Sequence, residues 1–198
     1  KGAFVCRSEA DIDDAIFRIF GKKEFGRAGD RVVVERLLRG EEASFIVWTD
    51  GNYIIPLLTT QDHKPVYDGD KGPNTGGMGA YTRPKIMHGL ESIMDDIVRP
   101  AVAGLANEKR LYKGVLYAGL MISNGQPYVL EFNARYGDPE TQPVMRLLES
   151  SLIDISFACV GGTLHSVTPK WSNDEAVCVV LATQGYPGDY QQNTGKPV

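Results

Sequence analysis

The sequence is poor in cysteine and histidine, the residues that most often build disulfide frameworks and zinc sites. Its three cysteines, Cys6, Cys159 and Cys178, lie far apart without a C-x-x-C pair, and its three histidines are equally scattered. This spacing predicts neither a disulfide framework nor a zinc or histidine metal site. We interpret the cysteines as small buried side chains of a protein in a reducing compartment, the cytoplasm.

A long hydrophobic run and an excess of positive charge are also missing. No apolar stretch approaches the roughly 18 residues of a membrane helix, and the N-terminal residues show no signal-peptide pattern. The formal net charge is −4, whereas a general nucleic-acid binder normally has a basic face. We therefore expect neither a membrane nor a nucleic acid among the partners.

What the chain does contain is enough apolar sequence, 42% of 198 residues, to bury a core. Helical and alternating patterns follow one another, and an Asp50-Gly51-Asn52 turn indicates a hairpin. The patterns predict strands over residues 3–6, 31–38, 43–49, 53–58, 114–122, 127–133 and 175–183. They predict helices over residues 8–20, 88–108, 141–148 and 152–160, with Pro100 as a possible kink.

Residues 59–84 show no clear period, and we expect a long loop there. Loops of this length inside a compact domain are usually functional or disordered. The segment mixes Val66, Tyr67, Met78 and Tyr81 with its glycines, whereas disordered linkers tend to be uniformly polar. We favour a functional loop, since glycines let main-chain N–H groups approach an anion closely.

A polar stretch closes the expected strand 127–133. Residues two apart in a strand share a face, so Glu131, Asn133 and Arg135 are expected on one face, with Leu130 and Phe132 on the other. Glutamate and asparagine oxygens suit magnesium or manganese, and an arginine nearby suits a phosphate or carboxylate. The alternative is an edge strand whose polar face is simply hydrated.

Residues 35–42 form a second stretch of interest. A strand that leaves a sheet through a glycine-containing segment exposes backbone N–H and C=O groups, which can bind an adenine edge. A carboxylate a few residues later could bind ribose hydroxyls. The alternative is an ordinary strand end with hydrated charges.

Several of these segments together resemble one enzyme family. Residues 35–42 resemble the hinge of ATP-grasp ligases, and Glu131-Phe132-Asn133 resembles their metal-binding Glu-x-Asn. The segments 61–64, 72–81 and 135–142 are similar to segments of the phosphoribosylamine–glycine ligase family, also called glycinamide ribonucleotide synthetase. The last matches the family's Arg-Phe-Gly-Asp-Pro-Glu-x-Gln, with Tyr136 at the aromatic position.

This resemblance implies an α+β protein with the ATP-grasp fold, in which mixed or antiparallel sheets have flanking helices, incomplete at both ends. It implies an enzyme of purine biosynthesis that joins glycine to 5-phosphoribosylamine while splitting ATP to ADP and phosphate, with Mg²⁺ or Mn²⁺. The alternatives are another ATP-grasp carboxylate–amine ligase and a nucleotide-binding module without catalysis.

The resemblance also implies residue roles. Glu131 and Asn133 would hold the metal, and Arg135 would steady the transferring phosphoryl group. ATP would be bound by Glu35, Arg36, Leu38, Glu42 and Leu130. The substrates would be bound by Lys64, Asn74, Thr75, Gly76, Gly77, Gly79, Asp138 and Glu140. Asp138 and Glu140 have an alternative role as caps of the helix that starts near Thr141.

One departure from the family pattern lies in the strand before Glu131, where many ATP-grasp ligases place another acidic metal ligand, whereas residues 115–122 contain none. The metal shell must then be completed by phosphates, water or another residue. The other departures concern the ends of the chain. Lys1-Gly2 resembles the tail of the family's phosphate loop, and the family's N-terminal domain and most of its C-terminal domain have no counterpart here. The resemblance divides the chain into the rest of an ATP-lid subdomain (1–34), the catalytic core (35–166) and a connector with the start of a C-terminal domain (167–198). We expect such a central piece to bind nucleotide weakly and to be inactive alone.

Overall fold

The computed structural model describes residues 2–193 and residue 195. The chain folds as two units, Lys1–Arg39 and Gly40–Val198. Lys1, expected at the tail of a phosphate loop, lies outside the described residues. So do residues 194 and 196–198 of the expected connector.

The first unit contains one regular helix, α1 (Glu9–Ile16), where the sequence predicts it. Ser8 Oγ accepts a hydrogen bond from the Asp11 N–H, and the Asp11 carboxylate accepts one from the Ser8 N–H at 2.9 Å. This reciprocal capping satisfies two backbone donors that a helix start leaves open. The helix continues as a π-helical turn, η1 (Phe17–Gly21), and a 3₁₀ turn follows at η2 (Gly26–Asp30).

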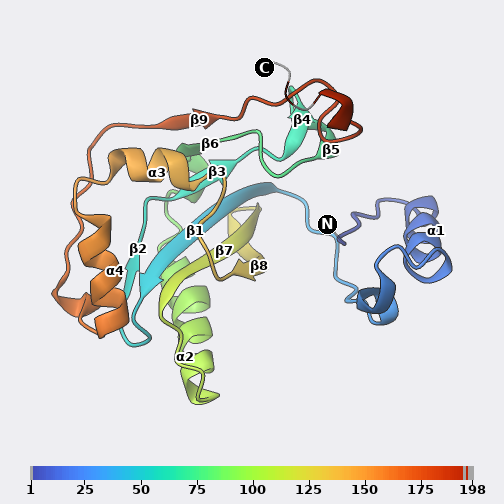
Figure 1. Cartoon of the computed structure of the whole chain (residues 1–198). Helices are drawn as coiled ribbons and strands as arrows, with labels where there is room; N and C mark the ends of the chain where they lie inside the picture. The colour runs from blue at the N-terminus through green and yellow to red at the C-terminus, as the bar shows by residue number, and fades with distance from the viewer. Residues whose placement is uncertain (1, 194, 196–198) are drawn as a thin grey trace. The chain divides into compact units, whose positions relative to one another are not determined.

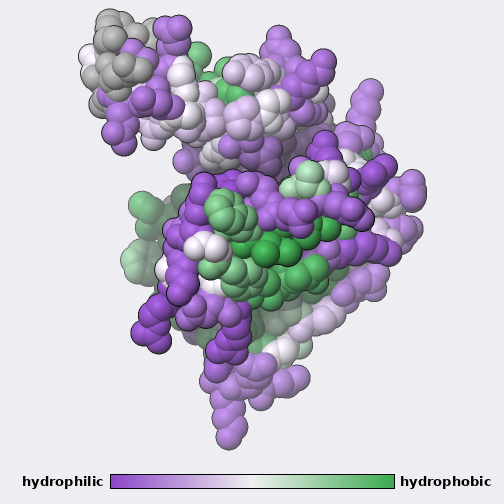
Figure 2. Space-filling model, turned by 90° about the vertical axis from the view of Figure 1, so that its right-hand side faces the viewer, coloured by the Kyte–Doolittle hydropathy of each residue, from purple (hydrophilic) through white to green (hydrophobic). Residues whose placement is uncertain are grey.

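The two strands expected in this unit, residues 3–6 and 31–38, are wrong. Neither segment pairs with another within residues 2–39. A strand requires a hydrogen-bonded neighbour, and a valine-rich composition does not supply one. Val33 and Val34 are accordingly 86% and 90% exposed. Figure 2 shows that apolar side chains, in green, also lie at the surface of the molecule.

The second unit is organised around a seven-stranded antiparallel sheet (Figure 1). The strand order is β8-β7-β1-β3-β6-β9, and β2 pairs with β1. The strands are β1 (Glu41–Thr49), β2 (Ile54–Pro56), β3 (Thr60–Asp62), β6 (Gly79–Thr82), β7 (Gly114–Ser123), β8 (Gln126–Asn133) and β9 (Val177–Val179). A separate two-stranded sheet pairs β4 (Pro65–Tyr67) with β5 (Lys71–Asn74).

The long loop expected over residues 59–84 is therefore wrong. The segment contains four short strands, β3 to β6, each of three or four residues. Strands this short show too few alternations to be recognised in a sequence. The strand expected over 175–183 is also shorter in the structure, where only Val177–Val179 pairs with β6.

Helices cover both faces of the sheet. On one face, a π-helical turn η4 (Met94–Val98) and helix α2 (Arg99–Asn107) place Val98 and Val102 in a buried cluster with Val47, Leu116 and Leu120. The π-helical turn ends two residues before Pro100, which has no N–H to donate to an α-helical ladder. The helical part of the expected 88–108 helix begins at residue 92.

The other face is covered by α3 (Thr141–Leu147), α4 (Leu152–Gly161) and the short turn η5 (Leu164–Ser166). Val144, Ile155 and Leu164 form a second cluster with Ile46 and Trp48 of β1. Each such side chain contributes on the order of 1.5–3 kcal/mol when fully buried. The remaining turns are η3 (Lys85–Met87) and η6 (Gln191–Asn193).

The turn at residues 50–52 is confirmed, and the Asp50 carboxylate accepts hydrogen bonds from the Asn52 and Tyr53 N–H groups. Cys159 is buried as expected, whereas Cys6 and Cys178 are partly exposed. Every helix within residues 2–193 is too short or too polar to cross a bilayer.

Candidate active site

The strand register brings polar residues together on the sheet face that also carries α3 and α4. Ser44 of β1 lies opposite Gly119 of β7, and Gly119 lies opposite Glu131 of β8. In the neighbouring row, Tyr117 lies opposite Asn133. Directly opposite residues share a face, so these side chains occupy one side of the sheet.

Glu131 and Asn133 contact each other on this face. Asn133 Nδ2 donates a hydrogen bond to Glu131 Oε1 at 3.0 Å, which agrees with the alternation predicted from the sequence. Gly119 leaves room for the glutamate, because a Cβ atom at that position would lie only 3.3 Å from Glu131 Cγ. A second carboxylate oxygen and the amide oxygen remain as acceptors for a ligand.

The expected continuation of this face to Arg135 is wrong, because β8 ends at Asn133. Arg135 follows in a bend, where its Nη1 donates to the carbonyl oxygen of Tyr136 at 2.9 Å. Leu130 lies at a β-bulge between two register pairs of β7 and β8. A bulge adds one residue to a strand and shifts its alternation, which a sequence pattern does not reveal.

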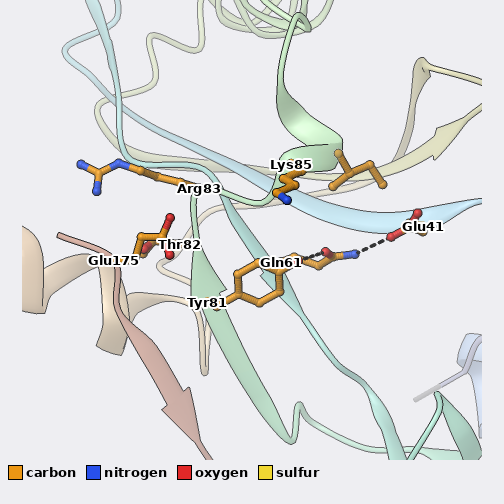
Figure 3. A pocket seen from close by; sticks show the side chains of 8 residues that line it. Glu41, Gln61, Tyr81, Thr82, Arg83, Lys85 and Glu175 are labelled. Atoms are coloured by element: carbon orange, nitrogen blue, oxygen red, sulfur yellow. Dashed lines mark hydrogen bonds between the residues drawn. The ribbon is translucent and has the colours of Figure 1, made fainter. Parts of the chain in front are cut away.

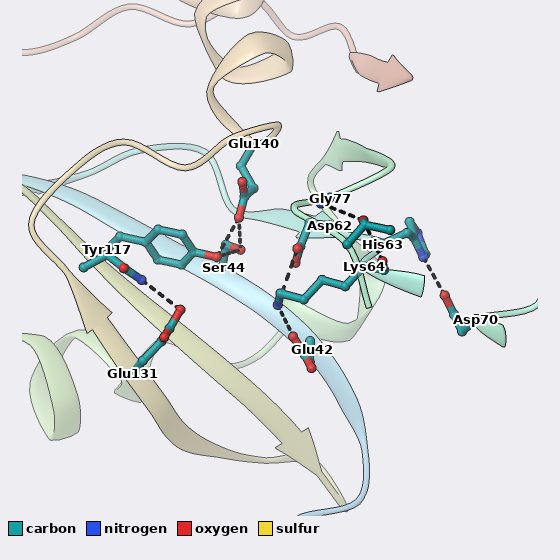
Figure 4. A network of polar contacts seen from close by, with 12 residues as sticks. Glu42, Ser44, Asp62, His63, Lys64, Asp70, Gly77, Tyr117, Glu131 and Glu140 are labelled. Atoms are coloured by element: carbon teal, nitrogen blue, oxygen red, sulfur yellow. Dashed lines mark hydrogen bonds and ion pairs between the residues drawn. The ribbon is translucent and has the colours of Figure 1, made fainter. Parts of the chain in front are cut away.

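A lysine joins two carboxylates beside this row (Figure 4). Lys64 Nζ forms an ion pair with Glu42 Oε2 and lies 3.4 Å from Asp62 Oδ2. Burial raises the pKa of Asp62, and the negative charges of Glu140 and Glu42 raise it further. The attraction of Lys64 lowers this pKa but only partly offsets the rise. Burial lowers the pKa of Lys64, but the attraction of Asp62 and the contact with Glu42 outweigh burial, so the net change is upward. The lysine therefore stays charged among these acids.

Glu140 is buried between three elements, with only 2% of its surface exposed. Its Oε1 atom accepts hydrogen bonds from Tyr117 OH at 2.6 Å and from Ser44 Oγ at 3.0 Å. Burial, together with the charge of Glu140, raises the pKa of Tyr117, so the phenol remains a donor. The capping alternative for Glu140 is wrong, because this residue stands at the N-cap position of α3 without a side-chain cap hydrogen bond.

The loop between β5 and β6 lies beside this cluster, but its amides are engaged within the chain. The Thr75 N–H donates to the Lys64 carbonyl at 2.8 Å and the Gly77 N–H to Thr75 Oγ1 at 2.9 Å. The Gly76 N–H donates to Tyr186 OH at 3.2 Å. Phosphate binding by these amides would thus require the loop to rearrange.

The remaining residues expected to bind substrate, Asn74, Gly79 and Asp138, differ in exposure and in their contacts. Asn74 ends β5 and is exposed, whereas Gly79 begins β6, where a Cβ atom would lie 2.6 Å from the Cys178 carbonyl oxygen. Asp138 is exposed, and its Oδ1 accepts a hydrogen bond from Gln142 Nε2 at 2.7 Å. Gly79 thus lets β9 approach, and Asp138 contacts the first turn of α3.

The hinge residues Glu35, Arg36 and Leu38 belong to the first unit. They lie in an irregular segment, with Glu35 and Arg36 exposed and Leu38 half-buried. In the second unit, the backbone of Gly40 lies so close to β7 that a Cβ atom on Gly40 would be 2.0 Å from the Ile122 carbonyl oxygen. Only glycine allows this approach.

Three residues of the cluster, Ser44, Asp62 and Tyr117, were assigned no role from the sequence, although Asp62 lies in the segment 61–64 that resembles the family. Ser44 and Tyr117 lie within largely apolar stretches of sequence, so nothing nearby in the sequence indicates that they belong to a polar cluster. Asp62 belongs to a strand of three residues. The available signal was alternation, which places Ser44 on the same face as Glu42.

A hollow of about 520 Å³ lies away from this cluster (Figure 3). Gln61 contacts the side chains of both Tyr81 and Glu41 there, and the two contact distances are 2.6 and 3.5 Å. The charged residues that line the hollow are Glu41, Arg83, Lys85 and Glu175, two of each sign. Glu41 and Gln61 alternate with Glu42 and Asp62, so they belong to the opposite face of the sheet.

A family model described as phosphoribosylglycinamide synthetase, ATP-grasp (A) domain, matches residues 1–141. The chain belongs to this family. It is 48% identical over 195 residues to a phosphoribosylamine–glycine ligase of Yersinia pestis, covering 97% of this chain and 46% of that protein. A ligase of the same name from Allochromatium vinosum is 50% identical over 196 residues, or 96% of this chain and 45% of the relative. This member of the family thus spans about half the length of the curated relatives it matches.

Solved structures agree with the family and the fold. A phosphoribosylamine–glycine ligase from Thermotoga maritima has a TM-score of 0.74 and 33% identity, covering 90% of this chain and 45% of that one. An N5-carboxyaminoimidazole ribonucleotide synthetase from Thermus thermophilus has a TM-score of 0.58 at 14% identity, covering 87% of this chain and 42% of that one. The second likeness concerns the fold alone. The expected ATP-grasp fold is therefore confirmed.

Proposed function

We propose that this chain is the ATP-grasp part of an enzyme that joins glycine to 5-phosphoribosylamine and splits ATP to ADP and phosphate. The observation that carries the proposal is the gathering of Glu42, Lys64, Glu131, Asn133 and Glu140 on one sheet face. Relatives named phosphoribosylamine–glycine ligase, at 48–50% identity, support this choice of substrates.

The reaction explains why these residue types are needed. A carboxylate is a poor electrophile, so the glycine carboxylate first attacks the terminal phosphoryl group of ATP and becomes an acyl phosphate, releasing ADP. The amine then attacks the acyl carbon, and phosphate leaves. Both steps concentrate negative charge between phosphate and carboxylate, which fixed cationic groups and hydrogen-bond donors stabilise.

Glu131 and Asn133 fit a divalent cation, Mg²⁺ or Mn²⁺, because both present oxygen donors from one face and Gly119 leaves space beside them. When bound with ATP, such an ion neutralises phosphate charge. Within the described residues, no group of three histidine, cysteine or acidic side chains could hold a metal. We therefore assign the remaining ligands to the ATP phosphates and water.

The other ATP roles follow the family resemblance. We assign adenine to the backbone of Arg36 and Leu38, with Glu35 beside its amino group and Leu130 on the adenine floor. Glu42 is assigned to the ribose hydroxyls, which requires its ion pair with Lys64 to loosen when nucleotide binds. Arg135 is assigned to the transferring phosphoryl group, for which its side chain must turn away from the Tyr136 carbonyl.

The substrates are assigned to the other side of the cluster. Glu140 and Asp138 are assigned to the amine, and Lys64 with the 74–79 segment (Asn74, Thr75, Gly76, Gly77 and Gly79) to phosphate groups. The divisions 1–34, 35–166 and 167–198 remain our assignment of lid remainder, catalytic core and connector. We place the enzyme in the cytoplasm, with small molecules as its partners.

The test is ADP release by the full-length protein that carries this chain, supplied with Mg²⁺-ATP. Glycine and 5-phosphoribosylamine are left out in turn. The proposal expects repeated ADP release only when both are present, since glycine without the amine allows at most one ADP per active site. Release with other acid–amine pairs would instead support a different carboxylate–amine ligase, and no release with any pair would leave a nucleotide-binding module.

A further inference from the structure

Glu140, Ser44 and Tyr117 form a compact polar triangle inside the second unit (Figure 4). Both hydroxyl groups contact Glu140 Oε1, and they also contact each other, with Ser44 Oγ and Tyr117 OH 2.8 Å apart. Ser44 belongs to β1 and Tyr117 to β7, whereas Glu140 directly precedes α3, and each is at most 6% exposed. Charge-assisted contacts of this kind are about twice as strong as neutral hydrogen bonds.

Fold stability does not by itself account for this triangle. Apolar residues of similar volume often replace a buried polar network without loss of stability. Glu140 also does not cap α3, although it stands at the N-cap position. The arrangement instead fixes one carboxylate in one place.

That place adjoins the proposed reaction site. Ser44 lies in the same row as Glu131, with Gly119 between them. The charge of Glu140 acts on Asp62, the neighbour of Lys64. Gly137 lies against the carboxylate, since a Cβ atom there would be 2.5 Å from Glu140 Oε2.

We propose that Ser44 and Tyr117 are positioning residues that hold the Glu140 carboxylate where it accepts hydrogen bonds from the primary amine that attacks the acyl phosphate. This inference rests on the proposed function. Ser44 and Tyr117 do not touch the amine; they act through Glu140. Glu140 recognises the amine, so its loss affects the second substrate rather than ATP.

The experiment uses Tyr117→Phe, Ser44→Ala and Glu140→Gln in the full-length protein, with kinetics for each substrate. We expect Tyr117→Phe and Ser44→Ala to lower kcat/KM for 5-phosphoribosylamine about ten- to hundredfold, the range of one hydrogen bond to a charged group. The KM for ATP should stay within about twofold of the wild-type value. In a Glu140→Gln background, Tyr117→Phe should have no further effect, because its action passes through Glu140.

Matched controls separate positioning from packing. Tyr112→Phe removes a hydroxyl that donates to the Val115 carbonyl, in a residue that packs with the cluster on the other sheet face. Thr60→Val alters the residue of β3 that lies opposite Ser44. The buried Thr60 hydroxyl has no hydrogen-bond partner within the described residues. Both controls should keep wild-type kinetics for the amine, whatever they do to the melting temperature.

Three results would overturn the inference. One is amine kinetics within twofold of wild type in both Tyr117→Phe and Ser44→Ala. Another is a Tyr117→Phe effect of full size in the Glu140→Gln background. The third is no ADP release by the wild-type protein with both substrates, which overturns the proposed function as well and so is distinguishable from the first two.

Discussion

Gly77 lies directly against the ring of Pro139, so that a Cβ atom at Gly77 would be 2.3 Å from Pro139 Cδ. Gly77 also has a φ of +130°, in the region that favours glycine. The contact joins the 74–79 segment to the turn that precedes α3. Two segments some 60 residues apart in the sequence, both singled out by their resemblance to one family, thus form one structural feature.

We expect Gly77→Ala to destabilise the protein by more than the roughly 1–3 kcal/mol of a strained backbone, because the clash with Pro139 adds to it. Gly89→Ala is the matched control, since Gly89 has a φ of +77° and nothing within 4 Å of its Cβ position. Urea denaturation measures both. Equal losses of unfolding free energy would show that the Pro139 contact contributes nothing.

Replacement of Glu131 or Asn133 by alanine should reduce turnover at least about a hundredfold and leave the fold intact. Both residues lie on β8, the edge strand of the sheet, and Glu131 is exposed. ADP release measures the turnover, and circular dichroism shows whether the fold is intact. Gln126→Ala, at the exposed start of the same strand, is the control, and near-normal turnover in Glu131→Ala or Asn133→Ala would refute our metal assignment.

Glu42→Ala should raise the KM for ATP about tenfold, with a smaller effect on kcat, because it removes the carboxylate assigned to the ribose. Glu41→Ala is a control one residue away, on the opposite face beside the separate hollow. Initial rates over a range of ATP concentrations distinguish the two. The same KM in both variants would exclude a ribose role for Glu42.

Asp62 should make stability depend on pH in an unusual direction. Burial raises its pKa in the folded protein, so between the unfolded value of about 3.9 and the folded value, the folded state binds more protons. Stability from this group is therefore greatest at low pH and falls as pH rises through the folded pKa.

The difference in unfolding free energy between wild type and Asp62→Asn isolates this effect from other acids. Urea denaturation from pH 3 to pH 8 should show wild type losing stability relative to the variant as pH rises. A constant difference, or one of opposite sign, would contradict the burial of a charged Asp62.

Long periodic elements were predictable from the sequence. The apolar stripe of α1, the strands β1, β7 and β8, and the helices α3 and α4 all lie within a few residues of their predicted positions. The contact between Glu131 and Asn133 on one face was predictable because two-residue alternation is a strong local rule. The strands expected at 3–6 and 31–38 fail because pairing depends on a neighbour that composition does not specify.

The hydrogen-bonded cluster was less predictable, since distant pairing creates it. The role of Ser44 becomes visible only when β1 pairs with β7 and α3 returns to the same face. Glu140 was noticed in its motif, yet its partners were not, because a buried carboxylate can be satisfied by any donor that the fold delivers. The strand end at Asn133 was predicted, but Arg135 was placed on the same face because the two-residue alternation was extended past that end.

The Ser44–Glu140 contact has a consequence for the order in which the protein becomes functional. The two residues are 96 positions apart, so at about 5–20 residues per second the ribosome completes Glu140 roughly 5–20 s after Ser44. Until then, the nascent sheet carries Ser44 and Tyr117 without their carboxylate. The cluster that we assign to the amine can therefore assemble only after β8, which carries our proposed metal ligands, has been synthesised.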